Sequence, residues 1–414
     1  MNNHKIAGLP ISGPAAGTCT VANYLKDLRA RCREGKQDKN LVIHTGIADA
    51  QSDIECLNRK AASALSYRHL EVAERSLPDV AFRYVSVYKD GDLVLFVYFQ
   101  LFTLTARSFN LHLDKSVAKH ILSLILDLKK AKVLVLGNAL RTEARSFCYD
   151  HEVFSEEQAW DAIAAVADSL AITESASAVI LNGATTNSRH AAKNMTAMGY
   201  SMPLEDLLME MNVNLEWNSL QDYTAALTRK YKTRAAKVLE AGKQLSVKPL
   251  SVAETKQCQP AISRLFGEVT DKQPFLFTRS GAEYIVALKE LYKDEFEVMG
   301  FYDGTTLVAF YSAFITEDAY ELFYVGFDTA LNTQYQLYFN LMLAGLGQTI
   351  ALRKASLKLG RTSFDAKASL GAKPVRANYL IKFRQIPDVA IKWLTTYFSA
   401  MEDTRWRQRN PMKD

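Results

Sequence analysis

The sequence predicts an α/β (α+β) fold built from two similar units in tandem. β-Rich runs surround Asp90-Gly91 and Asp303-Gly304, and Asp-Gly is the strongest short signal for a hairpin turn. The 414 residues suffice for two domains, since one domain takes roughly 100 to 200 residues. Each unit is expected to be a mixed, largely antiparallel sheet flanked by helices.

The same order of elements follows in both halves: hairpin, strand, helix, strand and a short helix that closes at a glycine. In the first half these elements are expected at 82–100, 131–138, 155–170, 178–183 and 188–199. In the second half they are expected at 296–314, 319–327, 332–354 and 357–360, with the short helix closing at Gly371. Ser155 and Gln158 form a capping box for the first long helix, and Asn332 is the N-cap expected for the second.

The extra residues of the first half are expected to form a helix over 116–130, and leading helices are expected over 53–65 and 282–292. The two halves divide near 213–218. This division predicts an N-terminal domain over 1–215 and a C-terminal domain over 216–414. The second domain then begins with a long basic interdomain helix over 219–243.

Composition favours a cytoplasmic protein without a metal centre. The five cysteines are widely spaced and contain no C-x-x-C pair, and the seven histidines show no H-x-H or H-x-x-x-H spacing. The N-terminus does not read as a secretory signal. The most apolar run, 93–104, is far shorter than the ~20 residues that span a bilayer. The net charge of +5 is too mild to indicate a nucleic-acid partner by itself.

The order of elements resembles the GNAT N-acyltransferase fold, and two such units in one chain resemble the Fem-type peptidyltransferases and their FemAB-like relatives. The stretches that carry this resemblance are 64–74, 219–234 and 359–371. The resemblance implies an N-acyltransferase that moves an acyl or aminoacyl group to an amine on a cell-envelope precursor or a small metabolite. It implies no tightly bound cofactor, and acyl-CoA or aminoacyl-tRNA as the cosubstrate.

One loop departs from the pattern of the CoA-using members. They present a Q/R-x-x-G-x-G/A loop whose backbone N–H groups hold a pyrophosphate at a helix N-terminus. The corresponding stretch from Gly326 to Tyr335 has no second glycine. Three interpretations therefore stay open: a Fem-type transferase, an N-acetyltransferase that depends on acyl-CoA or an acyl carrier protein, and a GNAT-fold binding protein without activity.

The second unit is the one predicted to hold the donor. An N-acyltransferase must position a carbonyl and a neutral amine, and it must stabilise the oxyanion. The residues predicted to be catalytic are Tyr324, Asp328, Tyr335 and Lys367. Those predicted to bind the donor are Gly326, Asn332, Tyr338, Gly360 and Arg361. The structural alternative is that Arg361 pairs with an acid, Lys367 covers a helix end and the tyrosines belong to the core.

The basic helix is predicted to bind phosphates. Lys230, Arg234 and Lys237 fall on one face at helical spacing, and such a face suits tRNA, an acyl carrier or a lipid-linked precursor. A solvated face without a partner is the alternative. The basic tail over 405–409 is interpreted either as an RNA or peripheral membrane contact or as a disordered terminus. The sequence leaves the oligomeric state open.

Overall fold

The computed structural model describes residues 24–28, 30, 40–61, 65–109, 130–141, 144–183, 194–201, 206–273, 275–279, 281–377, 379–384, 386 and 407–413. The helix expected over 116–130 lies outside these residues except for its last position. Of the short helix expected over 188–199, residues 194–197 are described and are helical.

The first sheet combines strands of the N-terminal half with one strand from the far end of the chain. Its strands are β1 (Leu41–His44), β2 (Val80–Lys89), β3 (Asp92–Thr103), β4 (Lys132–Leu136), β5 (Phe147–Tyr149), β6 (Ala178–Asn182) and β14 (Tyr379–Phe383). Their order is β1-β2-β3-β4-β6-β14, with β5 beside β3. Asp90 and Gly91 have φ angles of 54° and 91°, as a type I′ turn requires. The hairpin predicted at this turn is confirmed.

The second sheet has the order β13-β7-β12-β11-β10-β9-β8. Its strands are β7 (Asp206–Asn212), β8 (Ser246–Pro249), β9 (Phe296–Asp303), β10 (Thr306–Ile315), β11 (Ala319–Phe327), β12 (Ser356–Gly360) and β13 (Lys373–Ala377). Because Asp303 pairs with Thr306, the turn residues of the predicted hairpin are Gly304 and Thr305, one position later than expected. Gly304 has a φ of 59°, which suits the first position of a type II′ turn.

The two units exchange equivalent strands. The closing glycines, Gly199 and Gly371, are 172 positions apart (371 − 199), and this offset maps β7 onto 378–384, the segment that contains β14. β7 pairs with β12 in the second sheet, whereas β14 pairs with β6 in the first sheet. The boundary between 215 and 216 stays a prediction, and across it each sheet receives one strand from the other half of the chain.

Helices cover both faces of the first sheet. α5 (Glu156–Thr173) packs on one face, and α2 (Gln51–Asn58) and α3 (Tyr67–Ser76) lie on the other with the short 3-10 helix η1 (Ile47–Ala50). A second 3-10 helix, η2 (Ala106–Phe109), follows β3, and its Phe109 ring packs against Phe275. The capping box predicted for α5 is present: Gln158 N donates to Ser155 Oγ, and Ser155 N donates to Gln158 Oε1.

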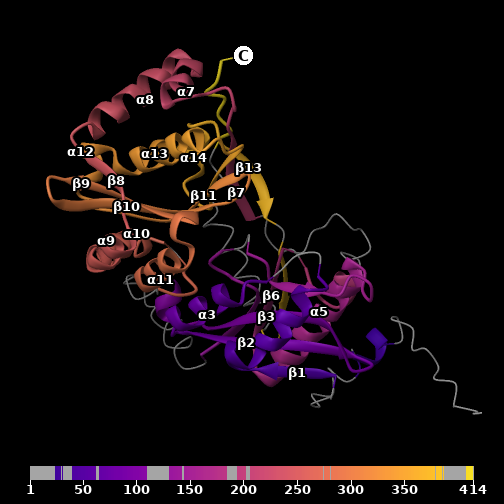
Figure 1. Ribbon diagram of the computed structural model, residues 1–414. Coiled ribbons are helices and arrows are strands. Elements are labelled where there is room, and N and C mark those ends of the chain that lie inside the picture. Colours follow the sequence, from indigo (N-terminus) through magenta and orange to yellow (C-terminus); the bar gives the residue numbers. More distant parts are fainter. Residues whose placement is uncertain are drawn as a thin grey trace, which may run out of the picture.

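The second unit has helices in three layers around its sheet (Figure 1). α9 (Val252–Gln257), α10 (Gln259–Thr270), α11 (Ala282–Tyr292) and the 3-10 helix η4 (Lys293–Glu295) lie on the side of the first unit. α12 (Asn332–Tyr335), α13 (Leu337–Ala351) and α14 (Phe364–Ala368) cover the opposite face. α7 (Leu220–Ala226) and α8 (Arg229–Gly242) form a further layer outside α13 and α14.

Two helices predicted as continuous are broken. The basic helix divides into α7 and α8 because Leu227 is extended, with a φ of −72° and a ψ of 145°. The helix expected over 332–354 divides into α12 and α13 at Gln336, which has left-handed angles of 49° and 44°. The N-cap of α12 is Leu331 rather than Asn332. Asn332 instead accepts a hydrogen bond at Oδ1 from Tyr338 N, 3.0 Å away, in the first turn of α13.

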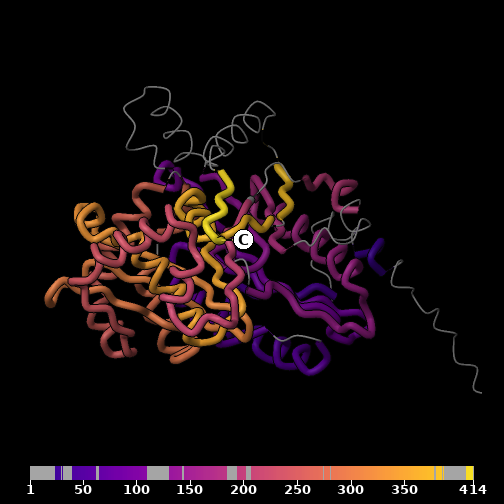
Figure 2. The backbone as a smooth tube through the Cα atoms, turned by 90° about the horizontal axis from the view of Figure 1, so that it is seen from above, coloured from indigo at the N-terminus to yellow at the C-terminus, as the bar shows by residue number. Residues whose placement is uncertain are grey.

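A shared hydrophobic core joins the units, which lie side by side in Figures 1 and 2. It combines residues of the first sheet and α3, such as Phe82 and Leu70, with residues of α10, α11 and β10, such as Leu265, Ile285 and Phe310. The relative placement of the two sheets is therefore fixed by buried apolar contacts as well as by the exchanged strands.

No helix in the described part of the chain is both long and apolar enough to cross a membrane. The same residues contain no group of three or more His, Cys, Asp or Glu side chains that could hold a metal ion.

Candidate functional site

The second sheet opens between two neighbouring strands. β11 and β12 run parallel and pair only over Ala319–Glu321 and Ser356–Lys358. Beyond that point β11 follows β10 as far as Phe327, whereas β12 ends at Gly360. α13 comes after β11 in the chain and α14 comes directly after β12, so these two helices flank the divergence.

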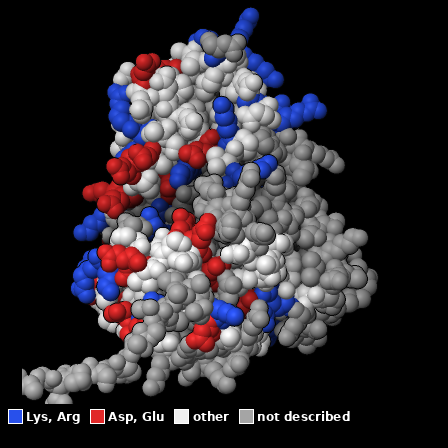
Figure 3. Space-filling view, turned by 90° about the vertical axis from the view of Figure 1, so that its right-hand side faces the viewer, with Lys and Arg blue, Asp and Glu red and all other residues white. Residues whose placement is uncertain are grey.

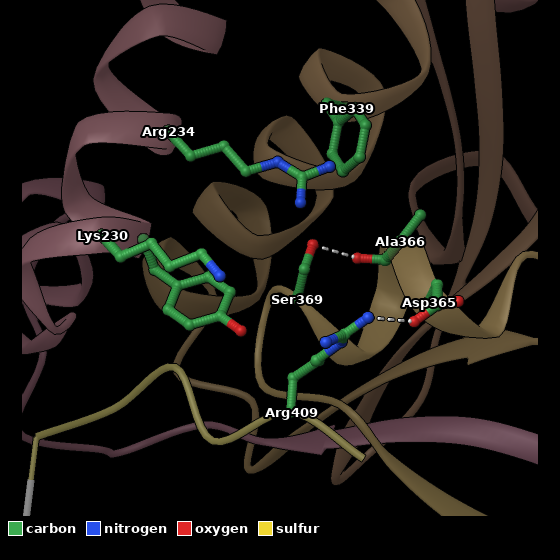
Figure 4. A pocket seen from close by; sticks show the side chains of 8 residues that line it. Lys230, Arg234, Phe339, Asp365, Ala366, Ser369 and Arg409 are labelled. Carbon is green, nitrogen blue, oxygen red and sulfur yellow. Dashed lines mark hydrogen bonds and ion pairs between the residues drawn. The ribbon is translucent and has the colours of Figure 1, made fainter. Parts of the chain in front are cut away.

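A pocket of about 430 Å³ lies between α8, α13 and α14 (Figure 4). Side chains from all three helices and from the C-terminal segment line it: Lys230, Tyr231, Arg234, Phe339, Asp365, Ala366, Ser369 and Arg409. A smaller apolar recess continues from it beneath α8, beside Tyr223, Leu343 and Leu370. The pocket thus combines a charged mouth with an apolar base.

The mouth of the pocket carries three cations and one carboxylate. Arg409 Nη2 is 2.9 Å from Asp365 Oδ1, so one positive charge is neutralised. The Arg234 guanidinium lies 4.5 Å from the centre of the Phe339 ring, and Lys230 Nζ lies 5.7 Å from the centre of the Tyr231 ring. Two positive charges therefore remain, and an anionic ligand group is the one that this mouth attracts.

The basic character extends over α8 as a whole. Its exposed cations are Arg229, Lys230, Lys232, Arg234 and Lys237. Figure 3 shows mainly Lys and Arg at the top of the face that it presents, the end of the molecule where α7, α8 and the C-terminus lie in Figure 1. Of the three residues predicted to bind phosphate, Lys230 and Arg234 line the pocket, whereas Lys237 is exposed and is not among the lining residues.

Residues 407–413, called the C-terminal strap below, run across the junction of α7 and α8. Thr228 N donates to Pro411 O at 2.8 Å and Lys413 N donates to Ala226 O at 2.9 Å. Leu227 and Met412 form a β-bridge between these two hydrogen bonds. Of the basic tail over 405–409, residues 407–409 belong to this strap, and Arg409 lines the pocket. Residues 405 and 406 lie outside the described part.

Lys367 lies beneath the turn that joins β12 to α14. Its Nζ donates to the carbonyl oxygens of Gly360, at 3.2 Å, and of Arg361. Lys367 is only 4% exposed. Burial, with a smaller contribution from the Arg361 charge, lowers the pKa of Lys367 to about 7. Arg361 itself is exposed.

The donor-binding and catalytic residues predicted on β11 lie against α10, on the face opposite α13. The Tyr324 ring is 4.7 Å from the Phe266 ring. A Cβ on Gly326 would come within 2.8 Å of the α10 backbone at Leu265, so glycine is required there by close helix packing. Asp328 Oδ1 accepts from Ala330 N and Leu331 N at 3.0 and 3.2 Å, which orders the loop before α12.

Two tyrosines predicted as site residues, Tyr335 and Tyr338, lie in or just after α12 and have different surroundings. The Tyr335 hydroxyl donates to Asp303 Oδ2 at 2.8 Å, which ties α12 to the tip of the β9–β10 hairpin. The Tyr338 ring centre lies 5.8 Å from the Phe327 ring centre, and its hydroxyl lies near the Ser363 side chain in the turn before α14. Tyr338, at the start of α13, therefore lies close to the turn between Gly360 and α14. Two residues predicted to bind the donor, Tyr338 and Gly360, are thus both at the strand divergence.

Sequence reasoning missed six of the lining residues: Tyr231, Phe339, Asp365, Ala366, Ser369 and Arg409. Asp365 and Ser369 lie close to Lys367 in the sequence, within the stretch 359–371 that carries the family resemblance. That stretch could therefore have indicated both residues. The sequence contains no signal that places Arg409 in the pocket, because its position depends on the strap, which returns to α7 and α8 from the end of the chain.

No family model and no curated protein sequence matches this chain. Among solved structures, a tandem GNAT protein from the clavulanic acid biosynthesis pathway matches with a TM-score of 0.50 and 12% identity, over 84% of this chain and 100% of that one. FemX matches with a TM-score of 0.49 and 9% identity, over 86% of this chain and 99% of that one. A GCN5-related N-acetyltransferase from Kribbella flavida matches with a TM-score of 0.44 and 10% identity, over 83% of this chain and 71% of that one. The first of these likenesses, together with the two mixed sheets, confirms the fold predicted from the sequence: this chain has the fold of a tandem GNAT protein.

Proposed function

We propose that the chain is an N-acyltransferase that takes an acyl or aminoacyl group from an anionic donor and transfers it to an amine. The observation that carries the proposal is the cationic pocket between α8, α13 and α14, of which α13 and α14 flank the strand divergence of the second unit. In the reaction the amine nitrogen attacks the donor carbonyl, the bond from carbonyl carbon to sulfur or oxygen breaks, and the amine loses a proton.

Lys230, Arg234 and Arg409 would bind the phosphates of the donor. A phosphate forms charge-assisted hydrogen bonds with Lys and Arg, and Arg can contribute two parallel N–H donors. Acyl-CoA and aminoacyl-tRNA both carry such phosphates, so the pocket suits either donor. The Fem-type aminoacyl transfer is the finer form of this proposal, and transfer from acyl-CoA or an acyl carrier is its alternative.

Among the residues predicted to act on the amine, Lys367 has the most suitable chemistry. A general base works best when its pKa lies near the working pH, and burial lowers the pKa of Lys367 to about 7. A neutral amine has two N–H bonds and one lone pair. The two N–H bonds match the carbonyls of Gly360 and Arg361, which leaves the lone pair for a proton. Tyr324, Asp328 and Tyr335 stay candidates, each already engaged in packing or in a hydrogen bond.

The test measures donor binding and turnover with a matched pair of lysine variants. Acetyl-CoA, longer acyl-CoAs and charged tRNA are each offered to the purified protein, first in a thermal unfolding assay. A ligand at 100 times its dissociation constant stabilises a protein by about 2.7 kcal/mol. Lys230→Ala and Arg234→Ala should each weaken donor binding tenfold or more. Lys237→Ala removes the same charge from the same helix outside the pocket, and it should leave binding unchanged.

Turnover with an amine acceptor then separates an enzyme from a binding protein. Release of thiol from acyl-CoA, or of uncharged tRNA, together with an acylated amine would support the transferase. Stabilisation by a donor without any product would instead favour a GNAT-fold binding protein. If no donor stabilises the protein, or if Lys237→Ala matters as much as Lys230→Ala, the role of the pocket is wrong.

A further inference from the structure

A second group of polar side chains is buried where the two units meet. It is called the seam cluster below and comprises His69, Tyr98, Gln100, Asn138 and Arg141 of the first unit and Tyr284, Tyr292 and Glu321 of the second. Tyr98, Gln100, Asn138 and Tyr284 are each at most 2% exposed, and His69 is 5% exposed. Such a cluster is costly unless its donors and acceptors are paired.

Hydrogen bonds and one ion pair cross between the units within the cluster. Asn138 Nδ2 donates to Tyr284 Oη at 3.2 Å and lies 3.4 Å from His69 Nε2. His69 Nδ1 is 2.9 Å from Tyr292 Oη. Arg141 Nη2 donates to Glu321 Oε2 at 2.8 Å. The cluster is therefore an ordered network made of both units.

Three donors of the cluster have no hydrogen-bond partner among the described residues. They are the Tyr98 hydroxyl, Gln100 Nε2 and Arg141 Nε, and all three atoms are buried. The remaining polar atoms around them are fixed: Gln100 Oε1 accepts from Ala139 N at 2.8 Å, and the Arg141 guanidinium stacks 3.6 Å from the centre of the Phe314 ring. A buried donor without an acceptor costs free energy, so three in one cluster indicate a ligand that supplies acceptor oxygens.

The charge of the cluster specifies the ligand further. Arg141 and Lys358 both contact Glu321, Arg141 at Oε2 and Lys358 Nζ at Oε1, 3.2 Å away. The other members are neutral near pH 7, because burial lowers the pKa of His69 to about 4 and raises that of the tyrosines Tyr98 and Tyr284. The Arg141 Nε–H, which has no partner among the described residues, belongs to a cation, and a charged donor bonds most strongly to an ionised acceptor such as a carboxylate oxygen.

We propose that the seam cluster is a binding site for a small carboxylate, whose oxygens accept from Tyr98, Gln100 and Arg141. The side chains of Arg141, Glu321 and Lys358 are 18%, 11% and 28% exposed, so the ligand reaches the site from their side. Phe314 and Tyr98 belong to the core between the units, whereas Tyr231 and Phe339 pack against the core on the other face of the second sheet. The site is thus separate from the pocket beside α8, and it does not depend on the proposed transferase activity.

The experiment titrates the full chain with acetate, with sodium chloride at the same ionic strength as the blank, and follows ¹³C-acetate by NMR and heat by calorimetry. Tyr98→Phe removes one of the three donors and should leave the fold intact, because that hydroxyl has no partner among the described residues. Tyr98→Phe and Gln100→Met should each weaken acetate binding tenfold or more. Tyr311→Phe is the matched control, a buried β-strand tyrosine on the other face of the second sheet, and should bind acetate as the unmodified chain does.

Several outcomes would overturn the proposal. One is the absence of acetate binding to a folded chain. Another is binding that Tyr98→Phe and Gln100→Met leave unchanged. Binding of inorganic phosphate in preference to acetate would reject the carboxylate class, and a crystal structure grown in acetate with only waters on the three donors would reject the site. Because no acyl donor is added, none of these results bears on the transferase proposal.

Discussion

At the scale of single residues, the contacts of His69 within the seam cluster determine the protonation state of its imidazole. Asn138 Nδ2 faces Nε2 and the Tyr292 hydroxyl faces Nδ1. An amide N–H can only donate, so Nε2 is the acceptor and the imidazole proton lies on Nδ1. A protonated ring would place a second donor against the Asn138 amide, beside the Arg141 charge. The neutral ring is therefore the form that the fold accommodates.

This protonation state predicts a loss of stability in mild acid. Burial, assisted by Arg141, lowers the pKa of His69 from 6.5 to about 4. The unfolded chain then binds more protons than the folded chain between pH 6.5 and 4, so the free energy of unfolding falls as the pH falls through that window. At about 1.36 kcal/mol per pKa unit, the full loss is about 3 kcal/mol. Urea unfolding at pH 7 and at pH 4 measures it.

His69→Gln keeps a polar side chain that cannot titrate, and it should remove most of this loss. The variant is expected to be less stable than the unmodified chain at pH 7 and to depend less on pH. An equal decrease in stability between pH 7 and 4 in both proteins would show that other groups, not His69, determine the acid sensitivity.

At the scale of elements, the sequence correctly predicted those turns and helix starts that depend only on residues close together in the chain. Asp90 and Gly91 adopt left-handed angles with little strain, and Ser155 and Gln158 cap each other, so neither prediction depended on the rest of the fold. The breaks at Leu227 and Gln336 had no comparable signal. Leu227 leaves the helix to bridge Met412, 185 positions away (412 − 227), and no helical periodicity reveals such a partner. The pocket was predicted in part for the same reason: Lys230 and Arg234 follow from spacing, whereas Arg409 follows from the strap.

In the C-terminal strap, one side chain lines the pocket and the backbone holds the α7–α8 junction. Two variants should therefore separate ligand binding from the order of that junction. Arg409→Ala removes a pocket cation and leaves the strap backbone in place, so it should weaken the binding of inorganic pyrophosphate by about tenfold. Removal of residues 410–414 takes away the acceptor of Thr228 N and the donor to Ala226 O. Hydrogen exchange at Thr228 should then become faster, because its amide loses its partner.

The two variants serve as controls for each other. Arg409→Ala should leave the exchange of Thr228 as it is in the full chain, provided that the strap is held by its backbone bonds and by Met412. Slow exchange at Thr228 after removal of 410–414 would mean that the strap does not hold the α7–α8 junction.

At the scale of the whole molecule, the reciprocal exchange of β7 and β14 makes each sheet depend on the other half of the chain. β7 lies between β12 and β13, inside the second sheet, and β14 completes the edge of the first sheet beside β6. The shared core adds α3 and α11 to this connection. A repeated sequence would otherwise be expected to give two domains that unfold separately.

The exchange therefore predicts one cooperative unfolding transition for both units. Leu380, in β14, is 8% exposed and packs in the core of the first unit, and replacing such a leucine with alanine costs about 2–5 kcal/mol. In Leu380→Ala, calorimetry and tryptophan fluorescence should show a single transition at a lower midpoint. Val375→Ala is the matched control on neighbouring β13: its side chain is 45% exposed, so the change should stay within about 0.5 kcal/mol. Two separate transitions, of which Leu380→Ala shifts only one, would show that the exchanged strands do not couple the units.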